Sequence, residues 1–255
     1  MSRIAQTLSN LKQDNKKALV TYIVAGDPDL KTSLQNMHDL VDGGADIIEL
    51  GMPFTDPMAD GPIIQAAHLR ALAHGTNLKS ILQLIHDFRI QNQTTPIVLM
   101  GYANPIHAYG IEQFYADAAQ AGIDGTLIVD IPPEEDAPWI AASRLNDLDF
   151  IRLATPTTTT DRLKKITAHA SGFLYYVSVA GITGTTSSNA DTVRAHIDIM
   201  KAQATLPIMI GFGIKTRNDA LQMSAIADGI VVGSAIIDAQ ANGKSIQSII
   251  ENLRV

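Results

Sequence analysis

Residues 43–51 read Gly-Gly-Ala-Asp-Ile-Ile-Glu-Leu-Gly, a turn of small residues that ends in aspartate and leads into a short apolar run. The same kind of turn comes before another apolar run at residues 121–124 and again at residues 225–228. A turn that recurs at one place in a unit indicates repeated βα units. Because such turns also occur in open doubly wound sheets, they do not by themselves predict a closed sheet.

Apolar runs rich in Val, Ile, Leu and Ala predict the strands. Few of these runs alternate with polar residues, which is typical of strands buried on both faces of a parallel sheet. We expect eight strands, at residues 18–25, 47–50, 97–102, 125–129, 150–154, 173–177, 207–210 and 230–232.

Segments of helical period lie around these runs. Ile4, Leu8 and Leu11 recur at helical spacing and predict an N-terminal helix. The residues between them are mostly polar, which is unlike the apolar region of an export signal. Pro133, followed by two glutamates, predicts another helix start. Further helices are expected at residues 30–43, 111–122, 161–170, 189–204, 216–227 and 244–253, and a short one from residue 233.

Length and element order together predict the fold class. The chain has 255 residues, and ~250 are typical of a (β/α)8 barrel. Eight strands with a helix after the last favour a closed sheet over an open one. No linker or low-complexity stretch divides the chain. We therefore expect an α/β protein, a (β/α)8 TIM barrel with an extra N-terminal helix, in which residues 1–255 form a single domain.

Composition narrows the function classes. The formal net charge is −7 and no basic run is present, which argues against binding of nucleic acid or of an anionic membrane. The absence of cysteine excludes disulfides and thiolate catalysis. No apolar run approaches the ~18 residues of a membrane span. With no export signal either, we expect a cytoplasmic protein.

Acidic residues after the second strand are the first candidates for chemistry, because such barrels form their sites at the carboxyl ends of the strands. Glu49 stands in an apolar strand, where burial should raise its pKa into a range that suits a general acid or base. A structural glutamate paired with a neighbouring donor, or one turned outward, is the alternative. Asp60 precedes Gly61 and Pro62, which predicts either a helix N-cap or a second catalytic carboxylate.

Glycine-rich turns follow the last three predicted strands, at residues 181–184, 211–214 and 233–234. Glycines let backbone N–H groups approach a phosphate, and a helix N-terminus adds a favourable dipole. We therefore expect a phosphorylated substrate that is held at this side of the barrel.

Other residue types argue against further chemistry. No lysine lies inside a predicted strand, which makes a Schiff base an unfavoured mechanism. The seven histidines are scattered without metal-ligand spacing, and nothing matches a dinucleotide fingerprint. We expect neither a metal nor another cofactor.

The segment at residues 48–65, IELGMPFTDPMADGPIIQ, resembles the signature of the tryptophan synthase alpha subunit family. The resemblance extends over nearly the whole chain, with further family-like stretches at residues 26–28, 100–105, 129–132, 175–178, 181–184 and 211–214. It implies retro-aldol cleavage of indole-3-glycerol phosphate to indole and glyceraldehyde 3-phosphate.

The resemblance also implies roles for individual residues. Glu49 would protonate indole C3, and Asp60 would accept the indole N–H and stabilise its positive charge. Tyr175 would orient the substrate, and Thr183 would contact Asp60 when a lid at residues 180–189 closes. The phosphate would be held by Gly184, Gly213, Gly233 and Ser234. The indole pocket would consist of Tyr22, Met100, Leu127, Val129, Leu153 and Phe212.

Two positions depart from the family pattern. Tyr22 adds a hydroxyl where the family often has phenylalanine. Val179 stands where some members have arginine, which puts a polar anchor for the lid in doubt.

The family's beta subunit is a separate pyridoxal-phosphate enzyme that receives indole through a tunnel. Its docking surface is matched by Asp56, Pro57, Asn104 and Pro105, so the resemblance implies an α2β2 heterotetramer. Three alternatives stay open. They are a stand-alone indole-3-glycerol phosphate lyase, a non-catalytic barrel that binds a phosphate ligand to regulate a partner, and an unrelated phosphate-binding barrel isomerase.

Overall fold

The computed structural model describes residues 1–177, 187–211 and 213–255. Within these ranges the strands form one parallel sheet of nine strands in the order β5-β4-β3-β2-β1-β9-β8-β7-β6. The two end strands, β5 and β6, are separated only by Ile151, so the chain itself closes the ring and the two pieces act as one barrel strand. The strands are β1 (Ala18–Val24), β2 (Ile47–Gly51), β3 (Ile97–Gly101), β4 (Gly125–Ile128), β5 (Asp149–Phe150), β6 (Arg152–Ala154), β7 (Leu174–Val177), β8 (Ile208–Gly211) and β9 (Gly229–Val232).

The predicted (β/α)8 barrel is therefore confirmed, and an open doubly wound sheet is not what the chain forms. Each predicted strand is present, with ends shifted by a single residue at most. Every residue of β1 and β2 is buried, which accounts for the lack of polar alternation in their sequences.

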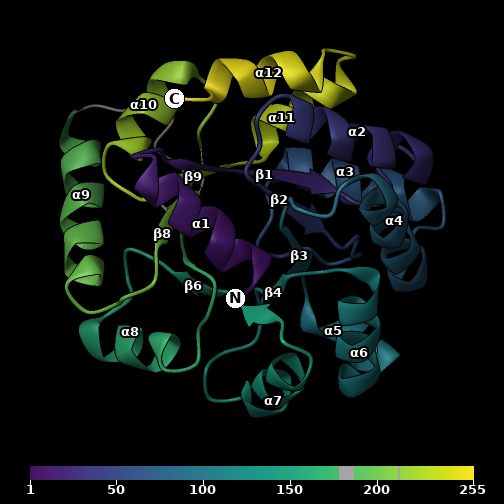
Figure 1. Cartoon of the computed structure of the whole chain (residues 1–255), viewed down its shortest axis with the longest axis horizontal. Coiled ribbons are helices and arrows are strands. Elements are labelled where there is room, and N and C mark those ends of the chain that lie inside the picture. The colour runs from purple at the N-terminus through teal and green to yellow at the C-terminus, as the bar shows by residue number, and fades with distance from the viewer. Residues whose placement is uncertain (178–186, 212) are drawn as a thin grey trace.

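Helices surround the strands (Figure 1). Among the described residues, none of them is both long and apolar enough to cross a membrane. They are α1 (Arg3–Gln13), α2 (Leu30–Asp42), α3 (Pro62–Ala73), α4 (Leu78–Gln91), α5 (Ala103–Tyr109), α6 (Ile111–Ala121), α7 (Ala137–Leu145), α8 (Thr160–Thr167), α9 (Ser187–Lys201), α10 (Arg217–Ser224), α11 (Ser234–Ala241) and α12 (Ile246–Leu253).

The predicted helix start at Pro133 is wrong. Residues 133–135 form a turn that is closed by a hydrogen bond from the Glu135 N–H to the Pro132 carbonyl, 3.0 Å. Helix α7 begins only at Ala137, after Asp136, whose carboxylate pairs with the buried guanidinium of Arg152. The predicted helices at residues 161–170, 189–204 and 216–227 also end too late, because their last residues form turns, bends or irregular backbone instead of α-helix.

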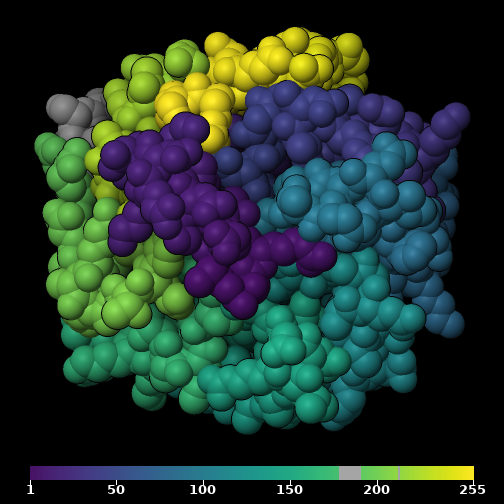
Figure 2. All heavy atoms as spheres, viewed as in Figure 1, coloured from purple at the N-terminus to yellow at the C-terminus, as the bar shows by residue number. Residues whose placement is uncertain are grey.

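Helix α1 closes the N-terminal end of the barrel. Its Ile4 and Leu8 are buried in the same apolar cluster as interior strand residues such as Val20 and Leu127. Figure 2 shows α1 across the centre of the face in view. At the other end of this cluster Met100, Val129, Leu153 and Val177 are only partly buried. The barrel is thus sealed at one end and open to a ligand at the carboxyl ends of its strands.

The recurrent aspartate turns have a structural role at the sealed end. The carboxylate of Asp46 accepts the backbone N–H of Leu19 at 2.8 Å, and that of Asp228 accepts the N–H of Ile208 at 2.9 Å. Asp124 accepts the N–H of Ile97 at 2.8 Å and pairs with Arg89 at 2.7 Å. Each aspartate therefore binds the first residues of a neighbouring strand and fixes where that strand begins.

We expect Asp124→Ala to destabilise the protein strongly. The Arg89 guanidinium and the Ile97 N–H would lose their shared acceptor in a place where the Arg89 and Asp124 side chains are only 6% and 4% exposed. Breaking a buried pair of this kind costs about 3 kcal/mol or more. Urea denaturation measures the loss. The control is Asp14→Ala, which removes an exposed pair with Lys16 and should cost less than ~1 kcal/mol; similar losses for both variants would contradict the assignment.

Candidate functional site

Glu49 lies inside the open end of the barrel. In β2, Ile48 and Leu50 belong to the cluster between sheet and helices, whereas Ile47 belongs to the interior cluster. Side chains alternate along a strand, so Glu49 faces the interior together with Ile47. Its neighbours in register are Tyr22 of β1 and Val98 of β3. The interpretation of Glu49 as a glutamate turned outward is therefore wrong.

The Glu49 carboxyl group is fully buried. Among the described residues, neither of its oxygens has a hydrogen-bond partner. Burial raises its pKa from 4.5 to about 8, and the negative charge of Asp60 adds to the rise. A carboxyl group in this environment holds its proton at neutral pH and can deliver it.

Asp60 is positioned by a tyrosine from the next strand along the sheet. The Tyr102 hydroxyl, directly after β3, donates to Asp60 Oδ2 at 2.7 Å and accepts the Ala59 N–H at 3.1 Å. The N-cap of α3 is Gly61, without a side-chain cap bond. The interpretation of Asp60 as the helix cap is therefore wrong, because its carboxylate faces Tyr102 and is only 5% exposed.

His68 also contacts Asp60, and we did not predict it. It lies on α3, with its Nε2 3.5 Å from Asp60 Oδ2. The whole residue is only 1% exposed. The sequence offers one signal for it, a histidine on the inward face of the helix that begins just after Asp60. Tyr102 carries a comparable signal, since it is the last residue of a predicted strand, at its carboxyl end.

Two tyrosines complete the surroundings of the carboxyl groups. Glycines make room for both rings, because a Cβ at Gly51 would overlap the Tyr22 hydroxyl and one at Gly211 would overlap that of Tyr175. Burial raises the pKa of each hydroxyl well above 10, and the charges of Glu49 and Asp60 raise it further. Both hydroxyls therefore stay protonated as potential donors to a ligand.

The apolar residues that the resemblance places in an indole pocket come together next to these groups. Met100, Leu127, Val129 and Leu153 pack together with Tyr175 in the interior cluster, and Met100 also packs against the cluster that contains Tyr22. Leu127 is fully buried, whereas Met100, Val129 and Leu153 are partly exposed at the open end. Phe212 lies outside the described residues.

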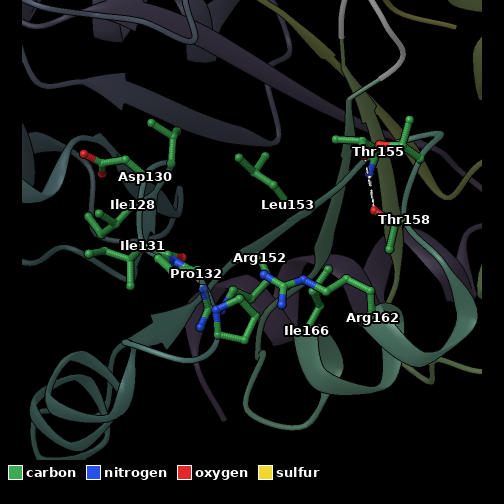
Figure 3. A pocket seen from close by; sticks show the side chains of 13 residues that line it. Ile128, Asp130, Ile131, Pro132, Arg152, Leu153, Thr155, Thr158, Arg162 and Ile166 are labelled. Carbon is green, nitrogen blue, oxygen red and sulfur yellow. Dashed lines mark hydrogen bonds between the residues drawn. The ribbon is translucent and has the colours of Figure 1, made fainter.

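A cavity of about 500 Å³ extends from this wall, between β6 and α8. Figure 3 shows Leu153 and Arg152 on opposite sides of β6, with Arg162 and Ile166 on the side of Arg152. Arg162 is paired with Glu134 at 2.5 and 2.8 Å, and Arg152 is paired with Asp136. Because both guanidinium groups have carboxylate partners, the described residues that line this cavity offer no free cation to a phosphate.

The glycine-rich turns offer backbone groups instead. Gly233 precedes α11, whose first residue is Ser234, and the first N–H groups of a helix have no partner within it. Gly213 has a φ of +81° with no atom within 4 Å of a Cβ position. Thr183 and Gly184 lie outside the described residues, as do Val179 and most of the expected lid.

The residues of the implied docking surface lie at this same end of the barrel. Asp56 and Pro57 are in the loop after β2, and Asn104 and Pro105 are in α5, directly after β3. Asp56 and Asn104 are exposed. The Pro57 carbonyl accepts the Asp60 N–H at 3.0 Å, so this surface is one turn of backbone away from a site carboxylate.

Comparisons with known proteins agree with this geometry. The family model for the tryptophan synthase alpha chain matches residues 8–254. The chain is similar to tryptophan synthase subunit alpha from Legionella pneumophila str. Paris, with 42% identity, a TM-score of 0.93, and coverage of 100% of this chain and 97% of that one.

Two further solved structures are tryptophan synthases from Mycobacterium tuberculosis. The open form with BRD0059 bound is 32% identical with a TM-score of 0.90, over 99% of this chain and 97% of that one. The aminoacrylate-bound form is 31% identical with a TM-score of 0.89, over 99% and 98%.

The raised pKa of Glu49 predicts a pH-dependent stability. Between 4.5 and about 8 the native state keeps a proton that the unfolded state has released, so stability falls as pH rises through this window. Glu49→Gln has no such proton. From about pH 5 to about pH 9, the variant should therefore gain about 3 to 5 kcal/mol relative to the unaltered chain.

Urea denaturation at several pH values measures this gain. Glu251→Gln, which changes an exposed glutamate of α12, is the matched control and should show no such trend. A constant difference between Glu49→Gln and the unaltered chain would show that Glu49 is not a buried, protonated group.

Proposed function

Because the chain belongs to the tryptophan synthase alpha chain family and is a lyase that cleaves indole-3-glycerol phosphate to indole and glyceraldehyde 3-phosphate, we propose that Glu49 and Asp60 carry out this reaction. One observation carries the proposal. A buried carboxyl group without a partner among the described residues lies beside a second carboxylate that is held by hydrogen bonding.

Glu49 is the general acid. Protonation of indole C3 by its carboxyl group turns the ring into an electron sink, with positive charge on the indole nitrogen. The carboxylate that results takes the proton of the adjacent glycerol hydroxyl, whose oxygen then forms the aldehyde as the carbon–carbon bond breaks. The bonding electrons return to the ring, which restores indole, and Glu49 ends the cycle protonated.

Asp60 stabilises the charge that this protonation creates. Tyr102 donates to its Oδ2 at 2.7 Å, and Oδ1 is the oxygen that accepts the indole N–H. A carboxylate that is already fixed where positive charge develops lowers the activation barrier of the reaction, because it does not have to reorient during the step. Tyr175 lies close enough to both carboxylates for their charges to raise its pKa, and it orients the substrate.

The rest of the substrate fits the remaining surfaces. Tyr22, Met100, Leu127, Val129 and Leu153 surround the apolar ring with side chains that are largely shielded from water. The phosphate lies against Gly213, Gly233 and Ser234, where a helix N-terminus supplies N–H groups. By the family resemblance, Thr183, Gly184 and Phe212 complete these contacts.

The partner is the beta subunit of tryptophan synthase, in an α2β2 heterotetramer. Exposed Asp56 and Asn104, with Pro57 and Pro105 beside them, form the docking surface at the open end of the barrel. Since the Pro57 carbonyl bonds the Asp60 N–H, a subunit that orders this loop also orders the Asp60 backbone. Docking thereby couples the partner to the reaction.

We expect Glu49→Gln and Asp60→Asn each to fold and bind substrate but to release indole about 10² to 10⁴ times more slowly. Glutamine cannot deliver a proton, and asparagine carries no charge to balance the indole nitrogen. Indole release from indole-3-glycerol phosphate measures the rate, with Glu251→Gln as control. Near-normal turnover of Glu49→Gln would contradict the assignment of Glu49 as the general acid.

We expect added beta subunit to stimulate indole release strongly, because docking orders the loop that carries Asp60. Asn104→Ala, at the docking surface and away from the carboxylates, should reduce this stimulation and leave the rate of the isolated chain unchanged. Turnover that is equally fast alone and with the beta subunit would favour a stand-alone lyase.

A further inference from the structure

His68 is held in one orientation by the backbone of the loop after β2. Its Nδ1 accepts the Phe54 N–H at 3.0 Å. A ring nitrogen that accepts a hydrogen bond carries no proton, so the imidazole is neutral and its proton is on Nε2. The tautomer of this buried side chain is thus set by a main-chain group.

Two polar groups of the site lie close to the protonated Nε2. It lies 3.5 Å from Asp60 Oδ2 and 3.5 Å from the Tyr22 hydroxyl oxygen. The Tyr22 hydroxyl is within hydrogen-bond distance of this N–H, and the Asp60 carboxylate is in electrostatic contact with it. Both side chains are almost completely buried. The ring therefore joins Phe54, at the start of the loop, to Asp60, near its end.

The helix under His68 is firmly anchored. Ala67 and Ala71 are fully buried against β1 in a cluster with Tyr22 and Val24. Two residues beyond His68, Arg70 forms a bidentate pair with the buried Asp27 at 2.7 and 2.8 Å. The imidazole is thus presented to the loop from a rigid support.

The second support of Asp60 comes from the residue that follows β3. Tyr102 donates to Asp60 Oδ2 at 2.7 Å, and its ring stacks on Phe54 with centroids 5.2 Å apart. One hydrogen bond leaves a carboxylate free to rotate about that contact. His68 contacts the same oxygen from α3, so side chains from two different elements together restrict the position of Oδ2.

We propose that His68 is a positioning residue that fixes the Asp60 carboxylate, and with it the Tyr22 hydroxyl, toward the substrate ring. It acts through Asp60 and does not itself touch the reacting atoms. The inference rests on the proposed role of Asp60 in the reaction.

Substitutions of His68 separate its two contacts. Gln places an amide N–H at the position of Nε2 and keeps the Asp60 contact, but it loses the acceptor for Phe54. Asn places an amide oxygen at the position of Nδ1 and keeps the Phe54 contact, but it cannot reach Asp60. Leu loses both, and His74→Leu, at the exposed end of the same helix, is the control.

We expect His68→Leu to lower kcat for indole release by about 10- to 100-fold with little change in KM. Gln should restore most of kcat, whereas Asn should restore resistance to urea but not kcat. Restoration of kcat by Asn and not by Gln, or a kcat that follows stability across the three variants, would overturn the proposal. So would a normal kcat in His68→Leu.

The Asp60→Asn background tests whether His68 works through Asp60. There, His68→Leu should cause no further loss of indole release, and a full additional loss would overturn the proposal. ¹⁵N NMR of the imidazole in the unaltered protein should show protonated Nε2 and unprotonated Nδ1, and the opposite tautomer would also overturn it.

The same series distinguishes the failure of this inference from the failure of the proposed function. If Asp60→Asn abolishes turnover while His68→Leu is normal, only the role of His68 is wrong. If Asp60→Asn turns over normally, the assignment of Asp60 itself is wrong.

Discussion

The structure depends on keeping the Glu49 carboxyl group inside a parallel barrel without a hydrogen-bond partner among the described residues. An unpaired buried carboxylate is costly, and the group avoids the charge by holding its proton. That solution works only in a rigid site, because any opening to water would return the pKa toward its ordinary value. Strands buried on both faces and tyrosine rings packed over glycines supply this rigidity.

Stability and chemistry are placed at opposite ends of the barrel. At the sealed end, α1 fills the interior, and Asp46, Asp124 and Asp228 bind the first N–H groups of neighbouring strands. At the open end, carboxyl groups and partly exposed apolar side chains meet. The free energy that the buried acid costs at the open end is offset by the well-paired charges at the sealed end.

The strands and Glu49 could be predicted from the sequence because their signals are local. An apolar run with one acidic residue indicates both a buried strand and an unusual carboxyl group. Prediction from the sequence fails where a residue far away in the chain determines the local structure. Tyr102, 42 residues away, binds the carboxylate of Asp60 that a local motif assigns to a helix cap. Arg152 pairs with Asp136, and α7 begins only after that residue. His68 looks like any helical histidine until the fold brings Phe54 and Asp60 to its ring.

The two carboxyl groups act as a coupled pair. Burial raises the pKa of Glu49 and the charge of Asp60 raises it further, so Glu49 is protonated when the substrate arrives. As the indole nitrogen gains positive charge in the proposed reaction, it compensates the charge of Asp60. The share of the Glu49 pKa rise that comes from Asp60 then weakens during the step in which the proton leaves. The orientation of Asp60 therefore controls both the stabilisation of the nitrogen and the acidity of Glu49, which is why a residue that only fixes this orientation can affect the rate.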